Sequence, residues 1–140
     1  MKRLFFGTTP ESQVSNELTI TLLRVFAGLA MALTHGFGKI PPPEMLVSGI
    51  GSMGVPVPEL FAWMAALAEF AGGILLAMGL LTRPAALFLA STMLVAGFVV
   101  HGADPFNVKE MAFLYLVIYL VFLTRGAGKW SLDHLISKKI

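Results

Sequence analysis

Two ionisable side chains lie deep within apolar stretches of this 140-residue chain, Arg24 in the first stretch and Glu69 in the second. If both stretches cross a membrane, a charge at such a depth costs at least ~2.5 kcal/mol and normally faces a bundle interior or a partner. One interpretation is a buried Arg24–Glu69 ion pair that fixes the register of two helices. A second is a catalytic proton or substrate site made by the same two groups. In a third, Arg24 alone extends to the cytoplasmic surface.

A second polar group falls near the opposite ends of the predicted helices. His35 lies about three helical turns after Arg24 and Lys39 follows one turn later, while His101 and Glu110 flank the last short turn. In a single bundle, these side chains converge on one outer pocket. Two histidines and a carboxylate can relay protons or ligate a transition metal, whereas histidines and lysines at a membrane interface also simply meet water and lipid headgroups. We assign no metal site, and a haem would need paired histidines at matching depth.

The composition indicates the environment in which these groups act. Hydrophobic residues make up 56% of the chain and charged residues 13%, against roughly 25% charged residues in an average soluble domain, and the mean hydropathy is +0.80. A small soluble domain could not bury that much apolar surface. This excludes an ordinary cytosolic domain, a disordered chain and a nucleic-acid binder. The chain contains no cysteine, which excludes disulfides and thiol redox chemistry within it.

Four apolar segments predict four membrane-spanning helices, at about residues 17–37, 60–81, 85–101 and 108–124. The first two reach the ~20 residues needed to cross a ~30 Å hydrocarbon layer, and the other two borrow flanking residues. None shows the polar stripe of a half-buried soluble helix. The predicted fold class is therefore all-α: an integral membrane bundle of four antiparallel transmembrane helices, in one domain over residues 17–124.

Small residues at a spacing of four predict which helix faces meet. Such stripes allow neighbouring backbones to approach closely within a membrane. The first and second helices each carry one stripe: Gly28, Ala32 and Gly36, and then Ala65, Glu69, Gly73 and Ala77. The second stripe contains the buried acid, so we expect Glu69 to face the bundle interior.

The connections and the charges predict the orientation. Between the first two helices lies a long loop rich in proline and glycine, from Gly38 to Val57, whose apolar middle suits the bilayer surface. An even number of spans puts both termini on one side, and that side holds seven basic residues against two: Lys2, Arg3, Arg83, Arg125, Lys129, Lys138 and Lys139, against Lys39 and Lys109. By the positive-inside rule, the N-terminal segment (residues 1–16) and the basic tail (residues 125–140) are cytoplasmic, and the long loop faces outward.

The chain resembles the DoxX family of small bacterial membrane proteins in three long strings: LLRVFAGLAMALTHGFGKI, GVPVPELFAWMAALAEFAGGILLAMGLLTRPAA and KEMAFLYLVIYLVFLTRGAGKWSLDHLI. The match covers nearly the whole chain after residue 17. It includes the Glu-x-x-x-Gly-Gly of the second helix and the Leu-Thr-Arg turn that follows. The family's polar positions fall on residues already singled out by depth and spacing: Arg24, His35, Lys39, Glu69, His101 and Glu110.

The resemblance implies a multi-pass protein of the bacterial inner membrane with a link to redox chemistry. The family takes its name from a subunit of an archaeal thiosulfate:quinone oxidoreductase, and other members are associated with redox and sulfur-stress systems. This chain resembles only the membrane unit and has no cysteine. A partner protein would therefore have to supply any sulfur chemistry.

Two functional hypotheses follow, and they differ on whether the chain is part of an enzyme. In the first, it is a quinone-linked redox subunit acting with partner proteins: Arg24, His35 and Lys39 contact the quinone, and Glu69 carries a proton. In the second, it is a non-enzymatic assembly protein or small-solute binder of the bilayer, whose buried polar groups only hold the bundle together. A homo-oligomer is compatible with both.

Overall fold

The structure of the chain is a computed structural model that describes residues 13–139, a range that is all-helical and has no strand. Four of its helices are long and apolar enough to cross a membrane: Val14–Lys39, Pro58–Met78, Thr82–Val100 and Phe106–Arg125. The predicted all-α fold with four spans is confirmed. Most of the predicted N-terminal segment, residues 1–12, lies outside the described residues.

Two of the four spans change helix type along their length. The first span consists of α2 (Gln13–Ala30), the π-helical η1 (Met31–Gly36) and the 3-10 turn η2 (Phe37–Lys39). The third consists of α5 (Thr82–Val95) and the π-helical η3 (Ala96–Val100). The second and fourth are the regular helices α4 (Pro58–Met78) and α6 (Phe106–Arg125).

The second helix ends three residues before its predicted end, for a backbone reason. Gly79 follows Met78 in the left-handed region, with φ of 67°, which is where a helix commonly terminates on glycine. The third helix begins at Thr82, just after Leu81, which is also left-handed at φ 49°. The connection between α4 and α5 is therefore a tight turn centred on residues 79–81.

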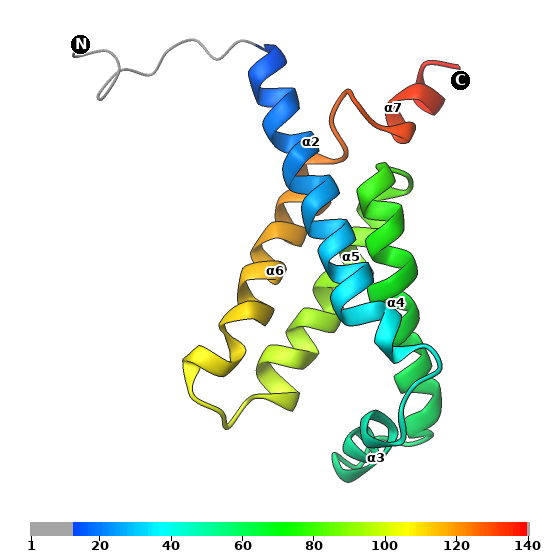
Figure 1. Cartoon of the computed structure of the whole chain (residues 1–140), viewed down its shortest axis with the longest axis vertical. Helices are drawn as coiled ribbons and strands as arrows, with labels where there is room; N and C mark the ends of the chain where they lie inside the picture. The colour runs from blue at the N-terminus through cyan, green and yellow to red at the C-terminus, as the bar shows by residue number, and fades with distance from the viewer. Residues whose placement is uncertain (1–12, 140) are drawn as a thin grey trace, which may run out of the picture.

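The core lies where α2 crosses α4 and where α5 packs against α6 (Figure 1). Apart from Arg24, its five largest fully buried side chains come from all four spans: Met31, Leu76, Leu89, Tyr119 and Phe122. The predicted small-residue stripes meet at the first of these contacts. A Cβ built on Gly73 would lie 2.7 Å from the Gly28 carbonyl oxygen, so glycine is what allows the two backbones to touch.

The segment predicted as a long loop contains a helix, α3 (Glu44–Ser52). Three consecutive prolines precede it, and the last of them, Pro43, takes the extended conformation just before the first turn. The prolines and glycines predicted an irregular loop. The prolines lie outside α3, and the two glycines inside it do not interrupt the helix. Val47 and Ile50 of α3 are half-buried, and α3 packs against α4.

The predicted basic tail is also partly helical, because α7 (Leu132–Ser137) docks on the turn between α4 and α5. The Asp133 amide donates to the Gly79 carbonyl oxygen at 2.8 Å. Its carboxylate accepts from the backbone amides of Leu81 and Thr82 at 2.8 and 2.9 Å. Figure 1 shows α7 at one end of the bundle, called the α7 end below, and α3 at the opposite end, called the α3 end.

Candidate functional site

A polar cavity of about 220 Å³ lies toward the α3 end of the bundle, lined by residues of all four spans. Its polar lining includes four of the residues singled out in the sequence, namely His35, Lys39, Glu69 and His101. Tyr115 and a set of apolar side chains complete the lining, among them Met31, Met93 and Met111. We call it the outer cavity, because it lies where the sequence predicts an outer pocket, and it is the candidate functional site.

An ion pair between Lys39 and Glu69 forms the most buried polar part of the outer cavity. The Lys39 Nζ lies 2.8 Å from Glu69 Oε1 and 2.6 Å from Oε2, so one ammonium contacts both carboxylate oxygens. The Glu69 side chain is 4% exposed, whereas that of Lys39 is 32% exposed. The pair therefore places a buried carboxylate under a cation that still reaches the mouth of the cavity.

Gly36 explains why these two residues meet. A Cβ on Gly36 would lie 2.5 Å from the Phe70 backbone nitrogen and 2.8 Å from the Glu69 carbonyl carbon. The first span therefore touches α4 at the level of Glu69. Lys39 follows Gly36 by less than one turn, which brings its long side chain over the carboxylate.

The two histidines of the outer cavity come from irregular stretches of helix. His35 lies within the π-helical η1, and His101 directly follows the π-helical η3. Short π-helical stretches are rare and frequently occur at functional sites. His35 packs its ring edge-on against Tyr115, with ring centroids 5.9 Å apart, and His101 Nδ1 lies 2.8 Å from Asp104 Oδ2.

Glu110 does not join the outer cavity, which corrects the predicted trio of His35, His101 and Glu110. Its side chain is exposed and is not part of the cavity lining. Glu110 belongs to the second turn of α6, where its helical position carries it away from the bundle axis. Among residues 13–139, no three His, Asp or Glu side chains are grouped so as to hold a metal ion.

Arg24 does not pair with Glu69, which corrects the predicted ion pair. The residue is 2% exposed, and its guanidinium donates to three backbone carbonyl oxygens: Nη1 to Leu76 at 3.0 Å and Ala77 at 2.7 Å, and Nη2 to Trp130 at 2.8 Å. The register explains this result, because Gly28 lies against Gly73 and Ala77 and Arg24 comes one turn earlier. Arg24 therefore joins the last turn of α4 to the C-terminal segment, far from the outer cavity.

Tyr119 is a fully buried tyrosine that the sequence did not single out as a site residue. It stacks on Tyr115 with ring centroids 5.8 Å apart. Within the described part of the chain, its hydroxyl has no hydrogen-bond partner. A buried hydroxyl in that state costs about 1–3 kcal/mol. The only signal in the sequence was the spacing of four between the two tyrosines, which places both on one face of α6.

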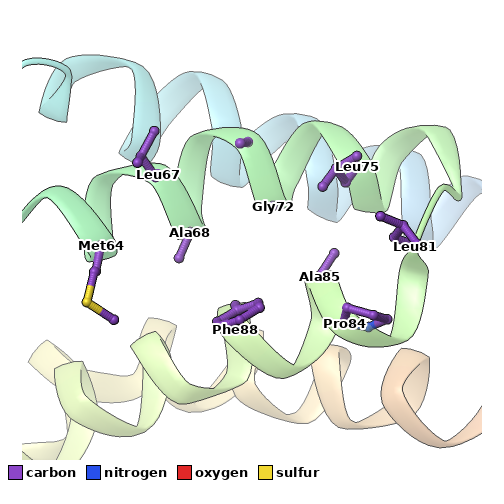
Figure 2. Close-up of a pocket in the computed structure, with 10 residues that line it drawn as sticks. Met64, Leu67, Ala68, Gly72, Leu75, Leu81, Pro84, Ala85 and Phe88 are labelled. Atoms are coloured by element: carbon purple, nitrogen blue, oxygen red, sulfur yellow. The ribbon is translucent and has the colours of Figure 1, made fainter.

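An apolar groove of about 380 Å³ between α4 and α5 offers no chemistry. Figure 2 shows Met64 and Ala68 of α4 facing Ala85 and Phe88 of α5 across it. No ionisable side chain lines the groove. In a bilayer, such a surface is suited to contact lipid chains, and it is not the candidate site.

Comparisons with known proteins agree with the membrane fold. A sequence model of the DoxX family matches residues 19–102. The chain is 33% identical to the inner membrane protein YqjF of Escherichia coli (strain K12) over 111 residues, which cover 76% of this chain and 84% of that protein. It is 30% identical over 125 residues to the Bacillus subtilis (strain 168) protein named "Putative oxidoreductase CatD", covering 89% and 91% of the two chains. No solved structure matches the chain.

Proposed function

The chain belongs to the DoxX family of membrane proteins, and from this premise we propose that its outer cavity binds a quinone headgroup as part of a redox complex. The observation that carries the proposal is the buried Lys39–Glu69 pair, because it puts a hydrogen-bond donor and a carboxylate inside the membrane-spanning part of the bundle. Groups of this kind within a membrane are costly and are usually functional.

Each polar side chain of the outer cavity has a role in this proposal. Lys39 is the donor to one quinone carbonyl oxygen, because its ammonium has three hydrogens and lies beside the cavity. His35 is the second donor, and its ring is oriented by the edge-on contact with Tyr115. Arg24, which the sequence suggested as a further contact, bonds to backbone carbonyls at the α7 end. We therefore place the quinone contacts on Lys39 and His35.

Three titratable side chains in or beside the outer cavity transfer protons in this proposal. Reduction of a quinone to a quinol takes up two protons and two electrons. A partner redox protein has to deliver the two electrons. Glu69 is placed to hold one proton at the floor of the cavity, because its carboxylate is buried and belongs to the cavity lining where the quinone would lie. His101 and Asp104 are half-exposed and bonded to each other, so they are placed to exchange protons with water at the mouth.

Two further points support the redox assignment. One relative, CatD, is named as an oxidoreductase, and the family resemblance links such chains to redox and sulfur-stress partners. With no cysteine in its sequence, this chain would leave thiol chemistry to those partners. We infer that it lies in the bacterial inner membrane with both termini cytoplasmic. The outer cavity then opens on the side of the membrane away from the cytoplasm.

Equilibrium dialysis of a short-chain quinone against the detergent-purified protein tests the proposal. We expect saturable binding, a drop of at least about tenfold in affinity for Lys39→Met, and a smaller drop for Glu69→Gln. Lys109→Met is the matched control, because among residues 13–139 Lys109 bonds to the Gly102 carbonyl oxygen alone and lies outside the cavity lining. Equal binding by all four proteins, or no saturable binding, would overturn the assignment.

A second candidate function rests on the completeness of the Lys39–Glu69 pair. The Lys39 ammonium already bonds both Glu69 oxygens, so neither group needs a ligand. The volume of the outer cavity, 220 Å³, is also below the roughly 300–1,000 Å³ of common ligand pockets. The chain would then be a non-enzymatic assembly protein or a binder of a small solute. Co-purification of a stoichiometric partner, with no response to quinone, is the result that favours this function.

A further inference from the structure

We propose that the α7 end carries a binding site for the phosphate of an anionic phospholipid headgroup. The site is a surface cavity of about 400 Å³ between the start of α5 and the C-terminal segment. Arg83, Ser131, His134 and Ser137 contribute side chains to its lining. This headgroup cavity lies at the opposite end of the bundle from the outer cavity, and the proposal does not depend on quinone binding.

The headgroup cavity has a cationic side chain with most of its N–H donors free within the described residues. Arg83 is exposed, and its single bond within the described residues is a long one, 3.3 Å from Nη2 to the Thr124 carbonyl oxygen. A guanidinium has five N–H donors in a fork that fits phosphate oxygens. The ring of His134 is half-buried and forms no hydrogen bond within residues 13–139, where this residue bonds through its backbone nitrogen and carbonyl oxygen.

One acidic residue also lines the headgroup cavity, but its carboxylate oxygens are already hydrogen-bonded. Both Asp133 oxygens accept hydrogen bonds from backbone amides, those of Leu81 and Thr82. The wider surface at this end is basic: Arg125, Lys138 and Lys139 are all exposed, and they outnumber Glu17, whose carboxylate accepts a hydrogen bond from the Lys129 amide. The local balance of charge therefore favours an anion.

Exposed apolar side chains beside the headgroup cavity distinguish a lipid from a soluble phosphate. Trp130, Leu135 and Ile136 are 50%, 57% and 47% exposed. Apolar side chains next to basic ones are typical of a segment that lies in the headgroup region of a bilayer, and tryptophan is enriched at that level. A phosphate with acyl chains attached matches both surfaces, whereas inorganic phosphate matches only the cationic one.

Lipid retention by the delipidated full-length protein tests the inference. The protein in neutral detergent is mixed with phosphatidylglycerol or phosphatidylcholine, and bound lipid is counted by native mass spectrometry. We expect preferential retention of phosphatidylglycerol, weakened about fivefold in Arg83→Gln, because one basic residue at a membrane surface contributes about that factor. Leu135→Ser with Ile136→Ser should also weaken it, through loss of the acyl contact.

Matched controls and a second arm make the test decisive. Lys109→Gln removes one charge that is bonded to one backbone carbonyl at the α3 end, and it should leave retention within twofold of the unsubstituted protein. Equal retention of the two lipids, or an equal loss in Lys109→Gln, overturns the inference. So does inorganic phosphate at millimolar concentration raising the thermal midpoint as much as phosphatidylglycerol does, because the site would then serve a soluble anion.

Discussion

Lys39 bonds both carboxylate oxygens of Glu69, a residue thirty positions later in the chain and 4% exposed in its side chain. The pair links the end of the first span to the middle of the second. Because Gly36 brings the two backbones into contact at this level, the pair is a product of helix packing. Its two members differ in exposure, and that difference has a measurable consequence.

Removing either member of the pair should destabilise the protein by unequal amounts. Lys39→Leu strands a buried carboxylate and should cost about 3–5 kcal/mol. Glu69→Leu leaves an ammonium that can turn toward water, so its cost should be smaller, about 1 kcal/mol. The double variant should recover part of the Lys39→Leu loss. Reversible unfolding in mixed micelles measures these free energies.

The same cycle with Arg24 in place of Lys39 is the control. Arg24 and Glu69 share no hydrogen-bond partner, so Arg24→Leu and Glu69→Leu should be additive within about 0.5 kcal/mol. Strong coupling between Arg24 and Glu69 would show that the register of α2 against α4 differs from the one described.

Arg24 should hold the C-terminal segment on the bundle. In Arg24→Lys the charge remains, but one ammonium cannot reproduce the planar fork that reaches the Leu76, Ala77 and Trp130 carbonyls. We expect a loss of about 2–3 kcal/mol, since hydrogen bonds to charged groups contribute about 1.5–3 kcal/mol each. Hydrogen exchange of the Leu81 and Thr82 amides, which donate to Asp133, should accelerate.

Arg125→Lys provides the comparison for that experiment. Arg125 is exposed and bonds to the Asn16 side chain at 2.9 Å, so the substitution should change stability by no more than about 0.5 kcal/mol. If Arg24→Lys leaves the exchange of the two amides as slow as Arg125→Lys does, the Arg24 contacts do not hold the segment.

The proposed orientation can be tested with single cysteines in this cysteine-free chain. Ser48 in α3 and Ser137 in α7 are both exposed and lie at opposite ends of the bundle (Figure 1). In intact cells, an impermeant thiol reagent should label Ser48→Cys and should label Ser137→Cys only after the cells are opened. The reverse pattern would put the outer cavity on the cytoplasmic side.

The number of spans and the packing faces could be predicted because they depend on local composition. Apolar length specifies a spanning helix, and the stripe from Gly28 to Gly36 specifies a close contact without reference to the partner. The partner of each charged residue could not be predicted, because it depends on how far one helix slides along another. The predicted Arg24–Glu69 pair needs the two residues at one level, whereas α2 crosses α4 and extends beyond its end (Figure 1). Arg24 lies beside Leu76 and Ala77, about two helical turns along α4 from Glu69, so it bonds to carbonyl oxygens and does not reach the acid.

Helices α3 and α7 could not be predicted for a related reason. α7 spans six residues, and isolated helices shorter than about 12 residues are marginal in water. It forms because Asp133 and the Gly79 turn bind each other across more than fifty residues of sequence, a contact that no local pattern shows. The exposure of Glu110 also depends on the rotation of α6 about its axis, which its nearly uniform apolar sequence does not specify.

Gly73 should tolerate no side chain, and Gly49 offers a matched comparison. Both glycines lie in helices, but a Cβ on Gly73 would sit 2.7 Å from the Gly28 oxygen and 2.9 Å from the Ala32 nitrogen, whereas a Cβ on Gly49 would meet nothing within 4 Å. Gly73→Ala should therefore cost about 3 kcal/mol, the upper end of overpacking penalties, because backbone atoms cannot move aside as side chains do. Gly49→Ala should stabilise the protein by about 0.5–1 kcal/mol, the helix preference of alanine over glycine.

The Gly73→Ala variant should also weaken quinone binding if the proposed function holds. Separating α2 from α4 moves Lys39 away from Glu69, since both contacts depend on the same helix crossing. Thermal midpoints and quinone dialysis on the two glycine variants give both readouts from the same preparations. Equal midpoints for Gly73→Ala and Gly49→Ala would mean that the helices are farther apart than the structure places them, and the close crossing that positions the outer cavity would have to be abandoned.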